Sequence, residues 1–138
     1  MPIYKKRQYK TVVSKKVQTI IKDLGLDVRI GRTPFDAGIM IKLNKGEIAC
    51  YFGQGVIWLR DMMPYDKHDQ QIVILHEIGH AIITHFFDSR NKTGISRKMH
   101  EVKANAAALV IASLLRLPMS VNIVRDFARF TKIKGLKI

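Results

Sequence analysis

The stretch ILHEIGHAI, residues 74–82, constrains the fold of this chain more than any other segment. It places His76 and His80 four residues apart in an otherwise apolar run, with Glu77 directly after the first histidine. Positions four apart in an α-helix differ by about 40° around the axis and about 6 Å along it, so both imidazoles point the same way and can grip one ion. The segment is therefore either a buried helix with incidental polar residues or a helix that carries a metal site.

His76, Glu77 and His80 match the HExxH pattern, in which two histidines hold Zn²⁺ and the glutamate is a general base. The ion lowers the pKa of a water molecule toward about 7 and polarises a carbonyl group, while the carboxylate takes the proton from the water. This is the minimal equipment for peptide hydrolysis. Because the pattern also arises by chance, other features must decide between the two interpretations.

A catalytic zinc site needs three protein ligands and one open position, and the next predicted helix offers a third ligand. The chain has three glutamates, and the last of them, Glu101, is followed four residues later by Asn105 on the same helix face. We expect Glu101 to complete a set of two histidines and one glutamate, and Asn105 to hydrogen-bond the outer nitrogen of a liganding imidazole. The alternative for Glu101 is a solvated carboxylate near a helix start, where the helix dipole favours it.

Small residues on both predicted helices favour a close approach between them. They are Gly79 and Ala81 in the first helix, and Ala104, Ala107, Ala108 and Ala112 in the second. Glycine inside a helix costs about 1 kcal/mol relative to alanine, and a close helix contact would explain why Gly79 is there.

The remaining pattern predicts one α+β domain spanning residues 1–138, with a small antiparallel or mixed sheet packed against a helical HExxH zinc-binding core. Helical periodicity and capping signals predict helices over 10–24, 66–87 with Asp66 as N-cap, 96–117 capped by Ser96 and stopped by Pro118, and 119–131. Short β-rich runs predict strands over 27–30, 38–43, 47–52 and 55–60, with NKG as the hairpin turn between the second and the third.

Charge and cysteine content limit the partners and the compartment. The formal net charge is +13, with basic residues concentrated near both ends. We expect non-specific nucleic-acid contact through these ends or attraction to an acidic protein, and a merely solvated basic surface is the alternative. The single cysteine, Cys50, cannot form an internal disulfide, and we expect it to fill a strand interior. With no apolar signal core or membrane-spanning run, the sequence predicts a cytoplasmic protein without membrane contact.

The other polar residues near the motif are weaker candidates. His85 lies about 140° around the helix from His80, and His100 lies about 100° from Glu101, so neither is expected to bind the same ion. His68, in the first turn of the motif helix, is not expected to do so either. A tetrahedral intermediate needs an oxyanion donor, for which the candidates are Tyr51, Tyr65 and Arg60, with a structural role favoured for each.

The run GVIWLR, residues 55–60, is a candidate for holding a peptide substrate. Proteases of this general class commonly bind substrate as an added strand on a sheet edge, with a side chain such as Trp58 lining a pocket. An ordinary strand inside the sheet is equally consistent with the run.

HEIGH, followed by HEVKAN at 100–105, an alanine-rich run and a leucine pair before Pro118, resembles the ImmA/IrrE family of HExxH metallopeptidases. The resemblance covers about residues 55–118 and implies that His76, His80 and Glu101 are zinc ligands and that Glu77 is the catalytic acid/base. It also implies a substrate class, the helix-turn-helix repressors of phages and integrative elements. The alternative that the resemblance implies is the regulation of stress genes, as in some relatives. In this chain Lys103 stands where the family prefers an acid, Ala107 where it often has Phe, and the proline comes four residues late.

Together these observations predict a zinc-dependent endopeptidase that cleaves a DNA-binding repressor, with Glu77 as general base. One alternative is a regulator that binds a repressor or DNA without cutting it. Another is a structural zinc domain, against which Glu77 argues because a closed site needs no base.

Overall fold

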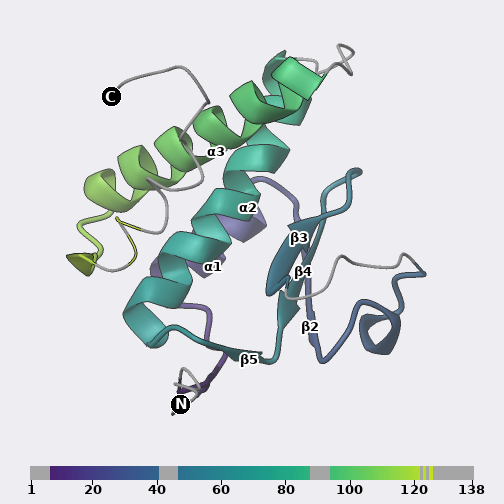
Figure 1. Ribbon diagram of the computed structural model, residues 1–138, viewed down its shortest axis with the longest axis vertical. Coiled ribbons are helices and arrows are strands. Elements are labelled where there is room, and N and C mark those ends of the chain that lie inside the picture. The colour runs from purple at the N-terminus through teal and green to yellow at the C-terminus, as the bar shows by residue number, and fades with distance from the viewer. Residues whose placement is uncertain (1–6, 41–46, 88–93, 122, 124, 126–138) are drawn as a thin grey trace, which may run out of the picture.

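Two small sheets and three α-helices make up the described part of the chain, an α+β arrangement (Figure 1). The computed structural model describes residues 7–40, 47–87, 94–121, 123 and 125. In chain order the elements are β1 (Tyr9–Lys10), α1 (Lys15–Asp23), β2 (Asp27–Gly31), the 3₁₀ helix η1 (Phe35–Ala37), β3 (Ala49–Tyr51), β4 (Val56–Arg60), β5 (Met62–Met63), α2 (Lys67–Phe87) and α3 (Gly94–Leu114). The predicted α+β class is confirmed.

The larger sheet has the strand order β2-β4-β3 and is mixed, since β2 and β4 are parallel while β3 and β4 are antiparallel. Its central strand β4 is buried on both faces. Ile57 and Leu59 lie in the main core, and Trp58 on the other face donates its indole N–H to the carbonyl of Gly31 at 3.1 Å. Because both sides of β4 are paired, the candidate role of residues 55–60 as a substrate-binding edge is wrong. The described edge strand beside the helices is β3.

The strand predicted over 38–43 is not formed in its described part. The chain instead makes the 3₁₀ helix η1, which ends at Gly38 with a positive φ of 78°, a backbone conformation that glycine adopts without strain. Residues 39 and 40 belong to no strand. Residues 41–46, with the predicted NKG turn, lie outside the described residues.

The first helix begins at Lys15, five residues later than predicted. The preceding residues are used elsewhere, because β1 pairs with β5 and the backbone N–H groups of Val12 and Ser14 donate to the side-chain oxygens of Gln70 and Gln71, both at 2.9 Å. The Ser14 hydroxyl then caps the helix by accepting from the backbone N–H of Val17. Contacts with α2, distant in sequence, therefore fix the start of α1.

Helix α2 is the central element of the molecule and packs against α3, α1, β3 and β4 (Figure 1). Its predicted N-cap is confirmed, since Asp66 Oδ1 accepts from the backbone N–H groups of His68 and Asp69 at 3.0 and 2.9 Å. Apolar residues of α2 dominate the buried core, which includes Val17, Ile57, Leu59, Met63, Ile72, Ile74, Leu75, Ile78, Ala108, Ala112 and Ile123. None of the described helices is both long enough and apolar enough to span a membrane.

Helix α3 begins two residues before the predicted cap Ser96 and ends at Leu114, three residues before the predicted end. The cause of the early end is a closing turn in which Arg116 adopts a positive φ of 55°. There the N–H of Leu117 donates to the carbonyl of Ala112 and that of Arg116 to the carbonyl of Ser113, the pattern of a Schellman cap. Of the helix predicted over 119–131, residues 121, 123 and 125 are helical, and the rest lies outside the described residues.

Candidate metal centre

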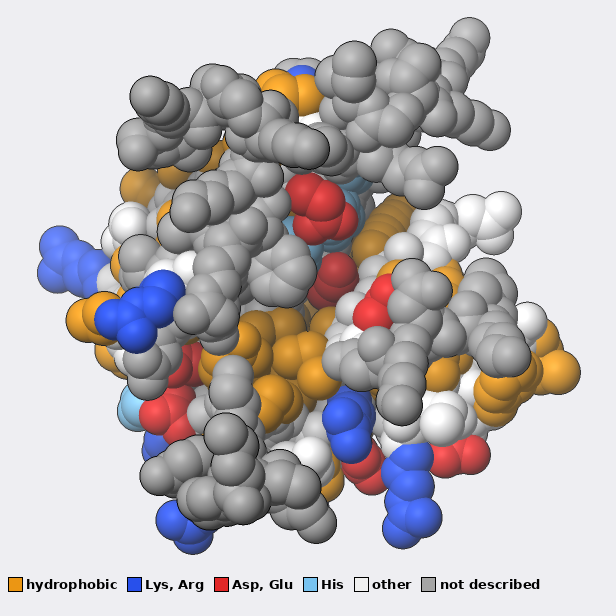
Figure 2. Space-filling model, in the orientation of Figure 1, with side chains coloured by type: hydrophobic (Ala, Val, Ile, Leu, Met, Phe, Trp, Pro, Cys, Tyr) orange, Lys and Arg blue, Asp and Glu red, His pale blue; other side chains and the backbone are white. Residues whose placement is uncertain are grey.

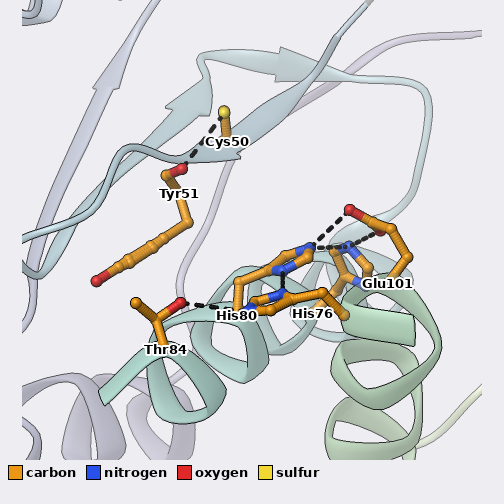
Figure 3. Close-up of polar contacts among 7 residues, drawn as sticks. Cys50, Tyr51, His76, His80, Thr84 and Glu101 are labelled. Atoms are coloured by element: carbon orange, nitrogen blue, oxygen red, sulfur yellow. Dashed lines mark hydrogen bonds and ion pairs between the residues drawn. The ribbon is translucent and has the colours of Figure 1, made fainter. Parts of the chain in front are cut away.

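The structure brings His76 and His80 of α2 together with Glu101 of α3 (Figure 3). The two Nε2 atoms lie 3.1 Å apart. The carboxylate of Glu101 reaches both, with Oε2 at 3.1 Å from His76 Nε2 and Oε1 at 3.0 Å from His80 Nε2. Among the described residues this is the one group of three or more histidine, cysteine or acidic side chains placed to share an ion. All three predicted ligands therefore meet at one point.

The separations in this triangle suit a shared cation. Ligand atoms held at about 2.0 to 2.1 Å from one Zn²⁺ in tetrahedral geometry lie about 3.3 Å from one another, close to the distances found here. Hydrogen bonds alone satisfy the triangle poorly. If both imidazoles donated to Glu101, two N–H groups would face each other across 3.1 Å. A cation at the centre would instead meet a lone pair from each group.

Close contact between the two helices allows Glu101 to reach the histidines. A Cβ placed on Gly79 would lie 2.8 Å from the carbonyl oxygen of Ala104 and 3.1 Å from its Cα, closer than real Cβ atoms approach backbone. Ala104, Ala108 and Ala112 are fully buried along the same interface. The predicted close approach is confirmed, and it involves the α3 backbone one turn beyond Glu101.

Glu77 lies beside the triangle and outside it. Its side chain is buried, with 6% of its surface exposed, and Oε2 has no hydrogen-bond partner among the described residues. Burial raises the pKa of the Glu77 carboxyl above its ordinary value, although the positive charges of His76 and His80 oppose the shift. A carboxyl group held this way is poised to exchange a proton with a molecule in the adjoining cleft.

The titratable groups of the triangle are electrostatically coupled. Burial alone would raise the pKa of Glu101, but hydrogen bonds and charge from His76 and His80 lower it well below its ordinary range. Burial alone would likewise lower the pKa of His76, but the hydrogen bond to Glu101, the charge of Glu77 and a side-chain hydrogen bond with Asn105 raise it. Asn105 is fully buried beside the triangle and helps to raise the pKa of His76. Its role toward a metal stays a prediction.

A cleft of about 650 Å³ opens over the triangle, between the helices and strand β3. Figure 2 shows acidic and histidine side chains together in this hollow. Tyr51 and Tyr65 line the cleft, whereas Arg60, the third oxyanion candidate, is not among the described residues that do. The Tyr51 hydroxyl oxygen accepts from the backbone N–H of Gly55 at 3.2 Å, which fixes the position of the ring.

Cys50 is the middle residue of β3, where it is half-buried, and it also lines the cleft. Its thiol lies 3.6 Å from the backbone carbonyl oxygen of Tyr51 (Figure 3). Burial, together with the negative charges of Glu77 and Glu47, raises the pKa of the Cys50 thiol to about 12. The side chain is therefore a neutral thiol at physiological pH.

The remaining histidines fall in different places. His68 is exposed in the first turn of α2, and the side chain of His85 lies outside the described residues. His100 is not part of the triangle, as predicted, but its ring lies beside that of His80, with 10° between the ring planes, centroids 4.9 Å apart and Nδ1 atoms 2.7 Å apart. The sequence analysis missed this contact, for which the one available signal was the position of His100 directly before Glu101.

Comparisons with known proteins add no identification, since no protein-family model, curated protein or solved structure matches this chain.

Proposed function

We propose that this protein is a zinc-dependent endopeptidase of the ImmA/IrrE type, acting on a helix-turn-helix transcriptional repressor. One observation carries the proposal. Three metal-ligating side chains converge with donor atoms 3.0 to 3.1 Å apart, beside a buried glutamate whose Oε2 has no partner among the described residues. A structural zinc site would need a fourth protein ligand and no such carboxylate.

In this proposal His76, His80 and Glu101, which line the cleft, would hold the Zn²⁺. When bound, the ion supplies Lewis acidity and lowers the pKa of a water molecule toward about 7. Glu77 takes the proton from that water as it attacks the peptide carbonyl, and then gives the proton to the leaving amine. The raised pKa of Glu77 suits both steps, because an acid/base works best when its pKa lies near the working pH.

The substrate peptide lies along β3 in this proposal. That strand is one edge of the larger sheet and forms one wall of the cleft. Its outer backbone groups can pair with an extended peptide, which places a peptide bond between the sheet and the metal ligands. In this proposal β3 therefore has the substrate-binding role that the sequence suggested for residues 55–60.

The repressor is proposed as substrate on two grounds. The HEIGH and HEVKAN motifs resemble those of a family that cuts helix-turn-helix repressors, and a net charge of +13 favours encounters with a protein bound to DNA. Regulation of transcription by removal of a repressor would follow. A cytoplasmic location belongs to the same proposal.

The proposal is tested by Glu77→Gln. The amide keeps the size of the side chain but cannot shuttle a proton, so cleavage of a cognate repressor should fall by at least about 10²-fold while metal content stays at the wild-type level. Cleavage is followed on a gel with purified helix-turn-helix repressor, and metal content by elemental analysis.

The matched control is Glu47→Gln, a glutamate that lines the same cleft but lies outside the ligand triangle. It should retain activity. If the wild-type protein relieves repression while the repressor stays intact, and Glu77→Gln works equally well, a regulator that binds without cutting is favoured instead.

A further inference from the structure

The imidazole of His100 lies against the side of His80 that faces away from the ligand triangle. Their Nδ1 atoms are 2.7 Å apart, and the rings are nearly parallel, 10° from coplanar orientation. The other nitrogen of His100, Nε2, lies 3.3 Å from the hydroxyl oxygen of Thr84, one turn beyond His80 on α2. A row of three polar side chains therefore extends from His80 to the exposed Thr84 (Figure 3).

Proton positions along this row follow from the role of His80. Its Nε2 needs a free lone pair to bind a metal, so the single proton of the neutral ring must be on Nδ1. The nearest acceptor for that proton is Nδ1 of His100 at 2.7 Å. His100 then carries its own proton on Nε2, directed at Thr84. If His100 instead donated its Nδ1 proton to His80, the proton of His80 would be on Nε2, and that nitrogen could not bind a metal.

We propose that His100 is a positioning residue that fixes the tautomer and ring orientation of His80 for metal binding. The inference rests on the proposed metal centre. Groups that accept the outer N–H of a liganding histidine raise its basicity and hold the ring in place, and their loss commonly weakens metal binding by about 10- to 100-fold. His100 does not bind the ion, because its two nitrogens face His80 and Thr84.

The position of His100 beside Glu101 in the sequence gives this role a geometric basis. Successive helix residues diverge by about 100°, so Glu101 reaches the Nε2 edge of His80 while His100 reaches its Nδ1 edge. Two consecutive residues of α3 thus bracket one imidazole of α2. The same pair joins the two helices at the site.

The test compares Zn²⁺ affinity of His100→Phe and His100→Asn with wild type, by competition with a chromophoric chelator. Phenylalanine keeps an aromatic ring beside His80 but has no acceptor for the Nδ1 proton of His80, so the Kd for Zn²⁺ should rise by about 10- to 100-fold. Asparagine presents an oxygen near the place of Nδ1 and should recover most of the loss. The matched control His68→Phe changes an exposed histidine of α2 and should leave the Kd unchanged.

A second measurement does not depend on the variants folding. Long-range ¹H–¹⁵N NMR of the zinc-loaded wild type should show a proton on Nδ1 of His80 and on Nε2 of His100. A protonated Nδ1 on His100, or an unchanged Kd in folded His100→Phe, would overturn the role of His100 while leaving the metal centre standing. A wild-type chain that binds no Zn²⁺ would overturn the proposed function together with this inference.

Discussion

At the scale of single residues, the proposed site separates metal binding from proton transfer. His76, His80 and Glu101 point at one another, whereas the carboxylate of Glu77 is buried beside them with one oxygen unpaired among the described residues. The net pKa shifts of the two glutamates are opposite. Burial acts to raise both pKa values, but the two imidazoles outweigh burial at Glu101 and only oppose it at Glu77. One carboxyl group therefore stays ionised as a ligand while the other can exchange a proton.

As the pH is lowered, protons should begin to compete with the metal for His76 at a pH that is still above 6.5. Binding requires a neutral imidazole, and the pKa of His76 lies above its ordinary value of 6.5 because Glu101 and Glu77 outweigh the effect of burial. Apparent Zn²⁺ affinity should thus be constant at high pH and fall by about tenfold per pH unit once the pH drops below the pKa of His76. Competition with a chelator across pH 5.5 to 9 measures the profile.

The exposed His68 provides the control for this profile, since His68→Ala should leave it unchanged. A break point at or below pH 6.5 would contradict the raised pKa.

The stability of the metal-free protein should change with pH in the opposite direction to the Zn²⁺ affinity, falling as the pH rises. The raised pKa of His76 stabilises the fold below about pH 6.5, and that contribution is lost as the pH rises through the folded-state pKa.

Helical spacing made the pairing of His76 and His80 predictable, because residues four apart share a face whatever the rest of the fold does. Glu101 was predicted on another ground, because a catalytic zinc site needs a third protein ligand and the next helix offered a glutamate. His100 could not be found in this way. Its contact with His80 depends on the rotation of α3 relative to α2, which a single helix does not encode. That Cys50 also lines the cleft could not be predicted for a similar reason, since alternation along β3 does not reveal which face of an edge strand borders a cleft.

At the scale of elements, the contact of Gly79 with Ala104 sets how close α2 and α3 lie. Gly79→Ala should gain about 1 kcal/mol of helix propensity but lose about 1 to 3 kcal/mol or more through overpacking against backbone, which no rotamer change relieves. We expect net destabilisation and weaker Zn²⁺ binding, because the clash lies one turn from Glu101. Urea unfolding and zinc titration measure both effects.

Ala106→Ser is the control for this substitution, because it adds one atom to an exposed position of α3. It should change stability by less than about 0.5 kcal/mol. If Gly79→Ala is more stable than wild type and keeps wild-type zinc affinity, the contact between Gly79 and Ala104 does not set the distance between the two helices.

Element types were predictable where local signals were strong, as with the Asp66 cap of α2 and the buried run of β4. Boundaries were not, because long-range contacts set them. Side chains of α2 hold the segment before α1 away from helix geometry, and Arg116 closes α3 in a conformation usually left to glycine.

At the scale of the whole molecule, a net charge of +13 predicts salt-sensitive contact with nucleic acid. Replacing Lys5, Lys6, Arg7 and Lys10 with glutamine should flatten the dependence of log affinity on log salt by up to about 3 to 4 units if all four meet phosphates. Hydrolysis of free repressor should not change, since the ligands lie on α2 and α3. Anisotropy with arbitrary duplex DNA from about 50 to 200 mM salt measures the slope. No binding at the low end would leave an acidic protein partner or solubility as the reason for the charge.

The metal content of purified protein tests the proposed centre most directly. Elemental analysis should find about one Zn²⁺ or similar ion per chain in wild type and in Glu77→Gln, and almost none in His80→Ala or Glu101→Ala. Glu47→Ala, which removes another glutamate from the same cleft, should keep the ion. Full occupancy and affinity in Glu101→Ala would contradict the assigned third ligand, and a wild-type chain that binds no metal would contradict the centre as a whole.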